Sequence, residues 1–140
     1  RPTTAHANSL GAMSKTALKV YTKGGSGICS PAFDGSGAVY VVSTGNGSIL
    51  SESEEKTGGG ELVEWVNTEG QPTGAAFDPK GRLYVADHAH AAVLNWSDDG
   101  SQQIVVREYE GKAFKGPTGL CFDSAGTMYF TDSGPLGEST

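Results

Sequence analysis

A segment of about 44 residues occurs three times along this chain, and its third copy is incomplete. Each copy carries a phenylalanine–aspartate pair, followed at fixed distances by a glycine and a tyrosine. The phenylalanines Phe33, Phe77 and Phe122 are separated by 44 and then 45 residues. The other two markers keep the same steps, at Gly37, Gly81 and Gly126 and at Tyr40, Tyr84 and Tyr129. Repeats of about 40–50 residues built from short strands are typical of β-propeller blades. The repeat therefore predicts a β-propeller.

The second copy shows the strands of one blade most clearly. Turn-forming residues divide it into four short apolar stretches, at 73–78, 82–87, 92–96 and 102–109. The first copy follows the same plan, with strands expected near 28–34, 38–43, 48–51 and 61–66. The third copy supplies only two strands, near 117–123 and 127–132. Asp-Gly and Asn-Gly pairs in the turns favour the positive φ of hairpins. We therefore predict an all-β fold of four-stranded antiparallel blades, about half of a six-bladed ring.

The phase of the repeat divides the chain into successive parts. These are a disordered or extended tail (1–16), an outer closing strand (17–22), a blade (23–68), a second blade (69–112) and a half blade (113–140). The closing strand, centred on residues 18–21, occupies the place of a fourth strand but precedes every complete blade. We expect it to pair as the outermost strand of the last blade of the ring, which hides a sheet edge.

Half a ring leaves apolar blade faces uncovered, because a blade buries its faces only against its neighbours. We therefore expect the chain to be a fragment of a larger ring. The expected partner is the remaining set of blades, supplied by a second polypeptide or by another copy of this chain.

Charge and composition exclude other classes of partner. The net charge is −6 and the pI is about 4.9, which argues against binding to a nucleic-acid backbone. No stretch approaches the ~20 consecutive apolar residues that span a bilayer, so no membrane partner is expected. Neither a secreted nor a cytoplasmic location is favoured. The two cysteines, Cys29 and Cys121, occupy non-equivalent positions of their repeats, and we expect them to be unpaired.

Residues that could bind a ligand are expected around the axis. In a propeller the inner strand of each blade begins, and its second strand ends, at the same rim, called the mouth below. Cys29, Thr73 and Thr118 lie four residues before the marker phenylalanines, and strand alternation directs them toward the mouth. The second strands end in Ser43, Asp87 and Asp132, which are followed by Thr44, His88 and Ser133. These residues should lie closer to the axis than the outer Trp65, Val66 and Val106.

Several segments resemble known families. Residues 71–78, 81–87 and 96–100 resemble an NHL-type propeller repeat. The segments Tyr109-Glu110-Gly111-Lys112, 116–120 and Tyr129-Phe130-Thr131-Asp132 resemble the gluconolactonase, senescence-marker-protein and strictosidine-synthase-like superfamily. The resemblance covers about residues 17–140. It implies a propeller that is commonly six-bladed.

The resemblance also implies a cation site, which this chain matches poorly. Members of the lactonase group hold a divalent cation, usually calcium, at the axis through Glu, Asn and Asp. Cys29 stands where the Glu is expected, and Thr118 where an Asn is expected; Thr73 is likewise neither carboxylate nor amide. Thiols and hydroxyls replace the oxygen ligands of calcium poorly. The resemblance places the catalytic Asp beyond Thr140. We expect no metal or cofactor bound by this segment alone, and calcium only if later blades supply ligands.

Each candidate residue also has a structural explanation. Asp87 and Asp132 are typical of carboxylates that cap the turn after a strand. His88 and His90 could bind a transition metal if the strand extended through them, but solvated loop histidines are favoured. Cys29 could be a nucleophile, although a small buried thiol is favoured because no partner histidine is evident.

Two functions are therefore open. The first is a hydrolase of small lactones or esters acting at the mouth, as the gluconolactonase and strictosidine-synthase-like resemblance implies. The second is a non-catalytic NHL-like propeller that serves as a binding or scaffold module. A small-molecule ligand fits either, and the catalytic residues stay unassigned.

Overall fold

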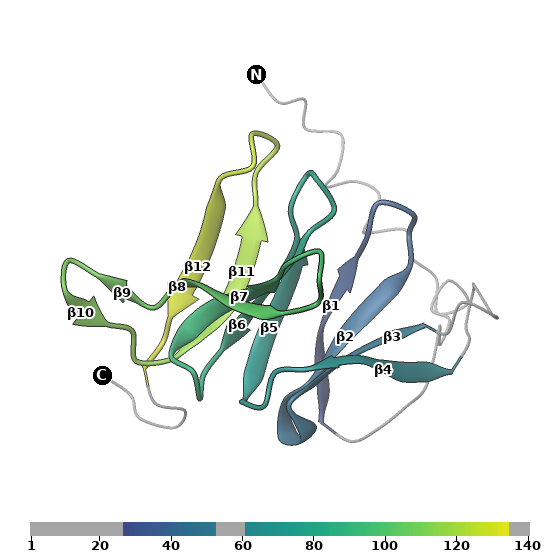
Figure 1. Ribbon diagram of the computed structural model, residues 1–140, viewed down its shortest axis with the longest axis horizontal. Helices are drawn as coiled ribbons and strands as arrows, with labels where there is room; N and C mark the ends of the chain where they lie inside the picture. The colour runs from purple at the N-terminus through teal and green to yellow at the C-terminus, as the bar shows by residue number, and fades with distance from the viewer. Residues whose placement is uncertain (1–26, 53–60, 135–140) are drawn as a thin grey trace, which may run out of the picture.

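The computed structural model describes residues 27–52 and 61–134, and its blades stand side by side (Figure 1). The first blade is an antiparallel sheet in the order β1 (Ile28–Phe33), β2 (Val39–Ser43), β3 (Ser48–Glu52) and β4 (Leu62–Asn67). The second has the order β5 (Pro72–Phe77), β6 (Leu83–Asp87), β7 (Ala92–Trp96) and β8 (Gln102–Val106). The third comprises β11 (Pro117–Phe122) and β12 (Met128–Asp132). The all-β partial propeller is thus confirmed. The predicted tail at 1–16 and closing strand at 17–22 lie outside the described residues.

The outer strand of the second blade is shorter than predicted. Sequence periodicity predicts one strand over 102–109, whereas β8 ends at Val106. Residues Glu108–Tyr109 (β9) instead pair with Lys112–Ala113 (β10) in a separate hairpin. Glu110 and Gly111 at its tip both have positive φ, 50° and 75°, as the tight hairpin turn requires. This hairpin projects beside the half blade (Figure 1).

The repeated aromatic residues form the contacts between blades. Tyr40 of the first blade packs edge-to-face on Phe77 of the second, with 4.9 Å between ring centroids. Tyr84 of the second blade makes the equivalent contact with Phe122 of the third, at 5.0 Å. The marker tyrosine of one blade thus contacts the marker phenylalanine of the next. The repeat encodes how blades stack as well as how each one folds.

The main core lies between the two complete blades. Its buried members are Ala32, Val42, Ile49, Ala75, Leu83 and Val85. Val42, Ile49 and Val85 have no solvent-exposed surface. These three residues lie on β2, β3 and β6, and Ala32 and Ala75 lie on the inner strands β1 and β5, so both blades contribute inner and middle strands to one shared apolar layer. Burial of apolar surface in this layer is the main force that holds the blades together.

The phenylalanine–aspartate pair also fixes the turn after each inner strand. Asp78 Oδ1 accepts hydrogen bonds from the backbone N–H groups of Lys80 and Arg82, both at 2.9 Å. Asp34 and Asp123 make the same pair of contacts two and four residues ahead. A side chain that satisfies two backbone donors stabilises a tight turn. These turns lie at the end of the blades opposite the mouth.

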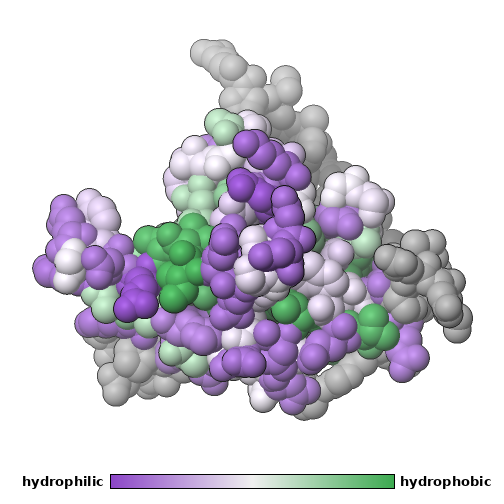
Figure 2. Space-filling view, in the orientation of Figure 1, coloured by the Kyte–Doolittle hydropathy of each residue, from purple (hydrophilic) through white to green (hydrophobic). Residues whose placement is uncertain are grey.

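Apolar surface is exposed on the outer strand of the second blade. Ile104 and Val105 of β8 are 49% and 41% exposed. Figure 2 shows an apolar patch in the region of β8 and β12. No helix in the described part of the chain has the length and apolar character needed to cross a membrane.

Candidate functional site

The mouth is a rim at which inner strands begin and second strands end. Antiparallel pairing places Ile28 opposite Ser43, Pro72 opposite Asp87 and Pro117 opposite Asp132. Each inner strand also has an irregular register at this end, with one more residue than its partner. Such bulges redirect side chains, so simple alternation along the strand does not by itself set their direction here.

The thiol of Cys29 lies at the first blade's part of the rim. Its Sγ is 3.5 Å from Thr44 Oγ1 and 4.0 Å from the carbonyl oxygen of Thr73. The prediction of a buried thiol is wrong, because Cys29 is the second residue of β1 and is exposed at the rim. Cys29 and Cys121 are both free.

Hydroxyl groups connect neighbouring inner strands across the rim. Ser30 Oγ donates a hydrogen bond of 2.8 Å to the carbonyl oxygen of Thr73. Thr73 Oγ1 in turn lies 2.8 Å from the carbonyl oxygen of Pro117 in the next inner strand. The Thr73 hydroxyl therefore donates to a backbone carbonyl of the third blade, and this hydrogen bond links the second blade to the third.

Three hydroxyls gather at the third blade's part of the rim. Thr118 Oγ1 lies 2.8 Å from Thr131 Oγ1 and 2.6 Å from Ser133 Oγ. Thr131 Oγ1 also accepts a hydrogen bond of 3.1 Å from the backbone N–H of Gly119. Thr131 and Ser133 are exposed and Thr118 is half-buried. This cluster offers neutral donors and acceptors to a bound molecule.

Asp87 has a structural role in the second blade. It is fully buried, and its Oδ1 accepts hydrogen bonds of 3.0 Å from the backbone N–H groups of Gln71 and His90. Its Oδ2 accepts one of 2.7 Å from Thr68 Oγ1. These contacts agree with the turn-capping interpretation. They occupy the carboxylate, which leaves little of it for a ligand.

Asp132 holds the entry to the third inner strand in a similar way. Its Oδ1 accepts hydrogen bonds from the backbone N–H groups of Lys115 and Gly116, at 3.0 and 2.7 Å. Unlike Asp87, it is exposed, because the third blade has no counterpart of β7 and β8 among the described residues.

The two histidines do not form a pair. Strand β6 ends at Asp87, so His88 and His90 lie in a turn rather than on one face of a strand. His90 Nε2 bonds the carbonyl oxygen of Thr68 at 2.8 Å, and His88 Nε2 is buried without a hydrogen-bond partner among the described residues. The predicted loop position is thus confirmed, but the two rings are half-buried rather than solvated, because both fold back onto the connections between blades.

His88 reaches across to the third blade. A side chain added at Gly116 would lie 2.4 Å from His88 Cδ2 and 2.8 Å from the carbonyl oxygen of Gly134. The ring therefore packs directly on this glycine, in the seam between the blades.

The mouth holds no assembled set of metal ligands in the described part of the chain. No three His, Cys, Asp or Glu residues there are grouped closely enough to hold an ion. The side chains gathered by the rim are mainly hydroxyls, which are poor ligands for calcium without carboxylates.

Ser30, Thr68 and Thr131 also belong to the rim but were not singled out in the sequence. Ser30 occupies the position of Gly74 in the next repeat and has a φ of +48°. That departure from the repeat was a visible signal. Thr68 and Thr131 carried none, because Thr68 acts through the connection between the first two blades and Thr131 through the irregular register of β11.

The comparisons with known proteins give sequence relatives and solved structures. No protein-family model matches the chain. A strictosidine synthase-like protein of Arabidopsis thaliana is 39% identical over 73 residues, which are 51% of this chain and 19% of that protein. A gluconolactonase of Zymomonas mobilis is 37% identical over 60 residues, 42% of this chain and 17% of that protein. The chain thus spans about a fifth of the length of the curated relatives it matches.

Solved structures share the fold. A gluconolactonase from Xanthomonas campestris superposes with a TM-score of 0.67 and 23% identity over 75% of this chain and 34% of that one. A virginiamycin B lyase from Staphylococcus aureus has a TM-score of 0.61 and 18% identity over 79% of this chain and 36% of its own. Together with the sequence relatives, these structures confirm the predicted resemblance to the gluconolactonase and strictosidine-synthase-like propeller superfamily.

Proposed function

We propose that this chain forms one side of a gluconolactonase- or strictosidine-synthase-like propeller that hydrolyses small lactones or esters at its mouth. The observation that supports it is the cluster of accessible hydroxyls formed by Thr118, Thr131 and Ser133 at the rim. A lactone or ester presents carbonyl and ring oxygens, and hydroxyl donors of this kind orient such groups. The sequence similarity to a gluconolactonase adds support for that substrate class.

In this proposal the described residues bind and orient the substrate. Thr118 and Ser133 donate hydrogen bonds to its oxygens, while His88 packs on Gly116 in the seam and holds the third inner strand in place. Asp87 and Thr73 act as positioning residues, since their polar atoms are engaged by the backbone. The residue that activates water belongs to the part of the ring not described here.

A cation, where present, depends on the other blades. Calcium needs six to eight oxygen ligands, including carboxylates, and Asp132 is the exposed carboxylate of the described rim. The Oδ1 of Asp132 already accepts two backbone hydrogen bonds. Calcium binding therefore requires carboxylate or amide side chains from later blades.

The test is hydrolysis of δ-valerolactone and p-nitrophenyl acetate by the protein with its complete ring, with and without added calcium. Thr118→Val should raise KM more than it lowers kcat, because it removes a binding hydroxyl. Ser124→Ala, an exposed substitution at the opposite end of the blade, is the matched control.

The alternative is a non-catalytic binding or scaffold propeller. The absence of turnover on both substrates, at every calcium concentration, would reject the hydrolase. Ligand binding that persists under those conditions and weakens in Thr118→Val would then support the binding module.

A further inference from the structure

A cavity lies away from the mouth, between the outer parts of the two complete blades. It has a volume of about 460 Å³, within the ~300–1,000 Å³ typical of ligand sites. Its walls come from β4, from the turn before β6 and from the turn between β7 and β8. Because β6 runs from this cavity toward Asp87 at the mouth, the two sites lie at opposite ends of the blade. Every wall is part of a complete blade.

Two tryptophans form its apolar wall. Trp65 of β4 and Trp96 of β7 meet edge-to-face, with 5.9 Å between ring centroids. Trp65 is 46% exposed, unusual for an indole within a contact between two blades. Neither indole N–H donates a hydrogen bond within the described residues. The cavity thus offers an open aromatic face together with unused donors.

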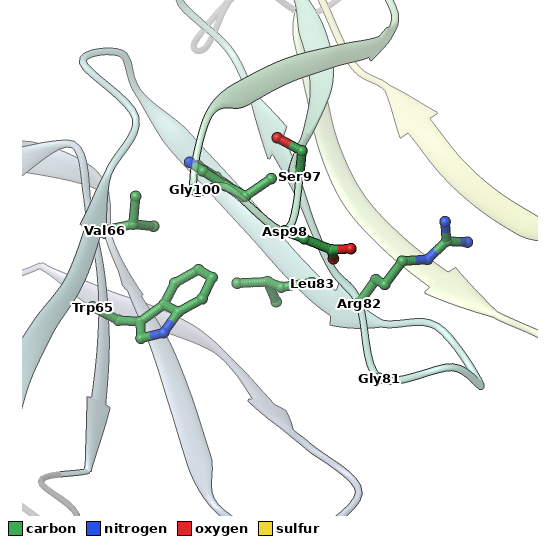
Figure 3. A pocket seen from close by; sticks show the side chains of 9 residues that line it. Trp65, Val66, Gly81, Arg82, Leu83, Ser97, Asp98 and Gly100 are labelled. Carbon is green, nitrogen blue, oxygen red and sulfur yellow. The ribbon is translucent and has the colours of Figure 1, made fainter.

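Asp98 forms a polar side of the cavity. Figure 3 shows the Leu83 side chain pointing toward the Trp65 indole, with Asp98 beside them, whereas the Arg82 side chain points away from Trp65. The Arg82 guanidinium is engaged elsewhere, by a salt bridge of 2.8 Å to Asp78 and by its position over the Tyr84 ring, 5.7 Å from the ring centroid. Asp98 makes no hydrogen bond in the described part of the chain. The cavity therefore presents an open acceptor beside the unused indole donors.

We propose that this cavity binds a single pyranose ring of a carbohydrate. The weakly positive C–H face of a sugar ring stacks on the electron-rich face of an indole. Its hydroxyls both donate and accept, so they match a carboxylate and an indole N–H at once. An anion fits less well because of Asp98.

The test uses the protein with its complete ring, labelled with 5-fluorotryptophan. The ¹⁹F resonances of Trp65 and Trp96 are assigned from Trp65→Phe and Trp96→Phe. Titration with methyl β-D-glucopyranoside should shift both resonances in a saturable way. Asp98→Asn should weaken binding about tenfold, a change equivalent to about 1.4 kcal/mol. Glu108→Gln, which alters an exposed carboxylate on the β9 hairpin, should leave the affinity unchanged.

Three controls make the proposal refutable. Cyclohexanol offers an apolar ring with one hydroxyl, and an equal response to it would overturn the role of the polar groups. Tetramethylammonium tests a cation site, and a response to it without a response to the glycoside would overturn the proposal. Saturating δ-valerolactone should leave the glycoside shifts in place, whereas competition would assign the sugar to the mouth instead. Failure of lactone hydrolysis alone would not affect any of these outcomes.

Discussion

The ring of Tyr84 lies 5.0 Å from the ring of Phe122, and this contact joins the second blade to the third. Tyr40 and Phe77 make the equivalent contact one repeat earlier. The two marker residues that define the repeat in the sequence therefore meet across blades rather than within one. Their spacing is maintained because a change in either residue alters an interface that recurs around the ring.

Adjacent inner strands approach most closely at Gly74. A Cβ added there would lie 2.1 Å from the carbonyl oxygen of Thr118, far inside van der Waals contact. Gly74→Ala should therefore push the two strands apart and lower the free energy of unfolding by about 1–3 kcal/mol. Urea unfolding monitored by circular dichroism measures the change.

Gly35→Ala is the control for that substitution. Gly35 has open space around its Cβ position and no positive φ. Its replacement should change stability by less than about 0.5 kcal/mol. Equal effects of the two substitutions would contradict the close approach of β5 and β11.

The buried carboxylate of Asp87 organises the connection between the first two blades. Asp87→Ala removes the acceptor for Gln71 N–H, His90 N–H and the Thr68 hydroxyl, of which the Thr68 hydroxyl is buried and the other two donors are partly buried. The expected loss is about 2–4 kcal/mol in the free energy of unfolding. Asp98→Ala, at an exposed turn, should cost less than about 0.5 kcal/mol. A loss below about 1 kcal/mol for Asp87→Ala would show that water satisfies these donors.

Much of the fold could be predicted because the repeat and the turn residues are local signals. The sequence located the inner strands and the stretch at 92–96, since alternating apolar residues and Gly or Asp turns bound each of them. It missed the break after Val106, because Arg107, Glu108 and Tyr109 include no Gly, Pro, Asn or Asp that would mark a bend. The exposure of Cys29 and the packing of His88 on Gly116 depend on contacts between blades, which no local pattern records.

A left-handed backbone conformation gives a further prediction. Ala91 has a φ of +50°, and the equivalent position of the first blade is Gly47, with a φ of +70°. An alanine in this region is strained by about 1 kcal/mol or more. Ala91→Gly should therefore stabilise the protein by up to about 1 kcal/mol, after the greater flexibility of glycine in the unfolded chain is offset.

The reverse substitution should act in the opposite direction. Gly47→Ala introduces the strain and places a Cβ 3.0 Å from Asn67 Oδ1. We expect a loss of about 1–2 kcal/mol. Differential scanning calorimetry of both variants gives the comparison, and a destabilised Ala91→Gly would show that the methyl group of Ala91 makes a necessary contact.

Acid should weaken the turns that aspartates hold. Burial of Asp78 pushes the pKa of its carboxyl up, but hydrogen bonds from the Arg82 and Lys80 backbone and from the Arg82 guanidinium outweigh this and hold the pKa below its usual 3.8. Hydrogen bonds from Ser97 and Ser101 lower the pKa of Asp99 to about 2. A lowered pKa in the folded state gives stability that is present above the unfolded pKa and is lost as the pH falls through the folded value.

The substitution Asp78→Asn tests this dependence. It removes the charge but keeps an oxygen that accepts the backbone hydrogen bonds, so its cost should be largest at neutral pH and should shrink below about pH 4. Urea midpoints measured between about pH 6 and pH 3 give the trend. A cost that stays constant over this range would assign the effect to shape rather than to charge.

The aromatic contacts also predict where neighbouring blades join. Phe33 is 63% exposed and Tyr129 is 57% exposed, although Phe77 and Tyr84, their equivalents in the second blade, pack against an adjacent blade. A preceding blade should therefore supply a tyrosine to Phe33, and a following blade a phenylalanine to Tyr129.

In the protein with its complete ring, Phe33→Ala and Tyr129→Ala should each cost about 3–5 kcal/mol in the free energy of unfolding, as expected for buried aromatics. In the 140-residue polypeptide the same substitutions should have little effect on unfolding but should reduce self-association, because they remove exposed apolar surface. Sedimentation velocity and urea unfolding of both forms provide the measurements. A cooperatively unfolding monomer of 14.4 kDa, unaffected by either substitution, would contradict the need for further blades.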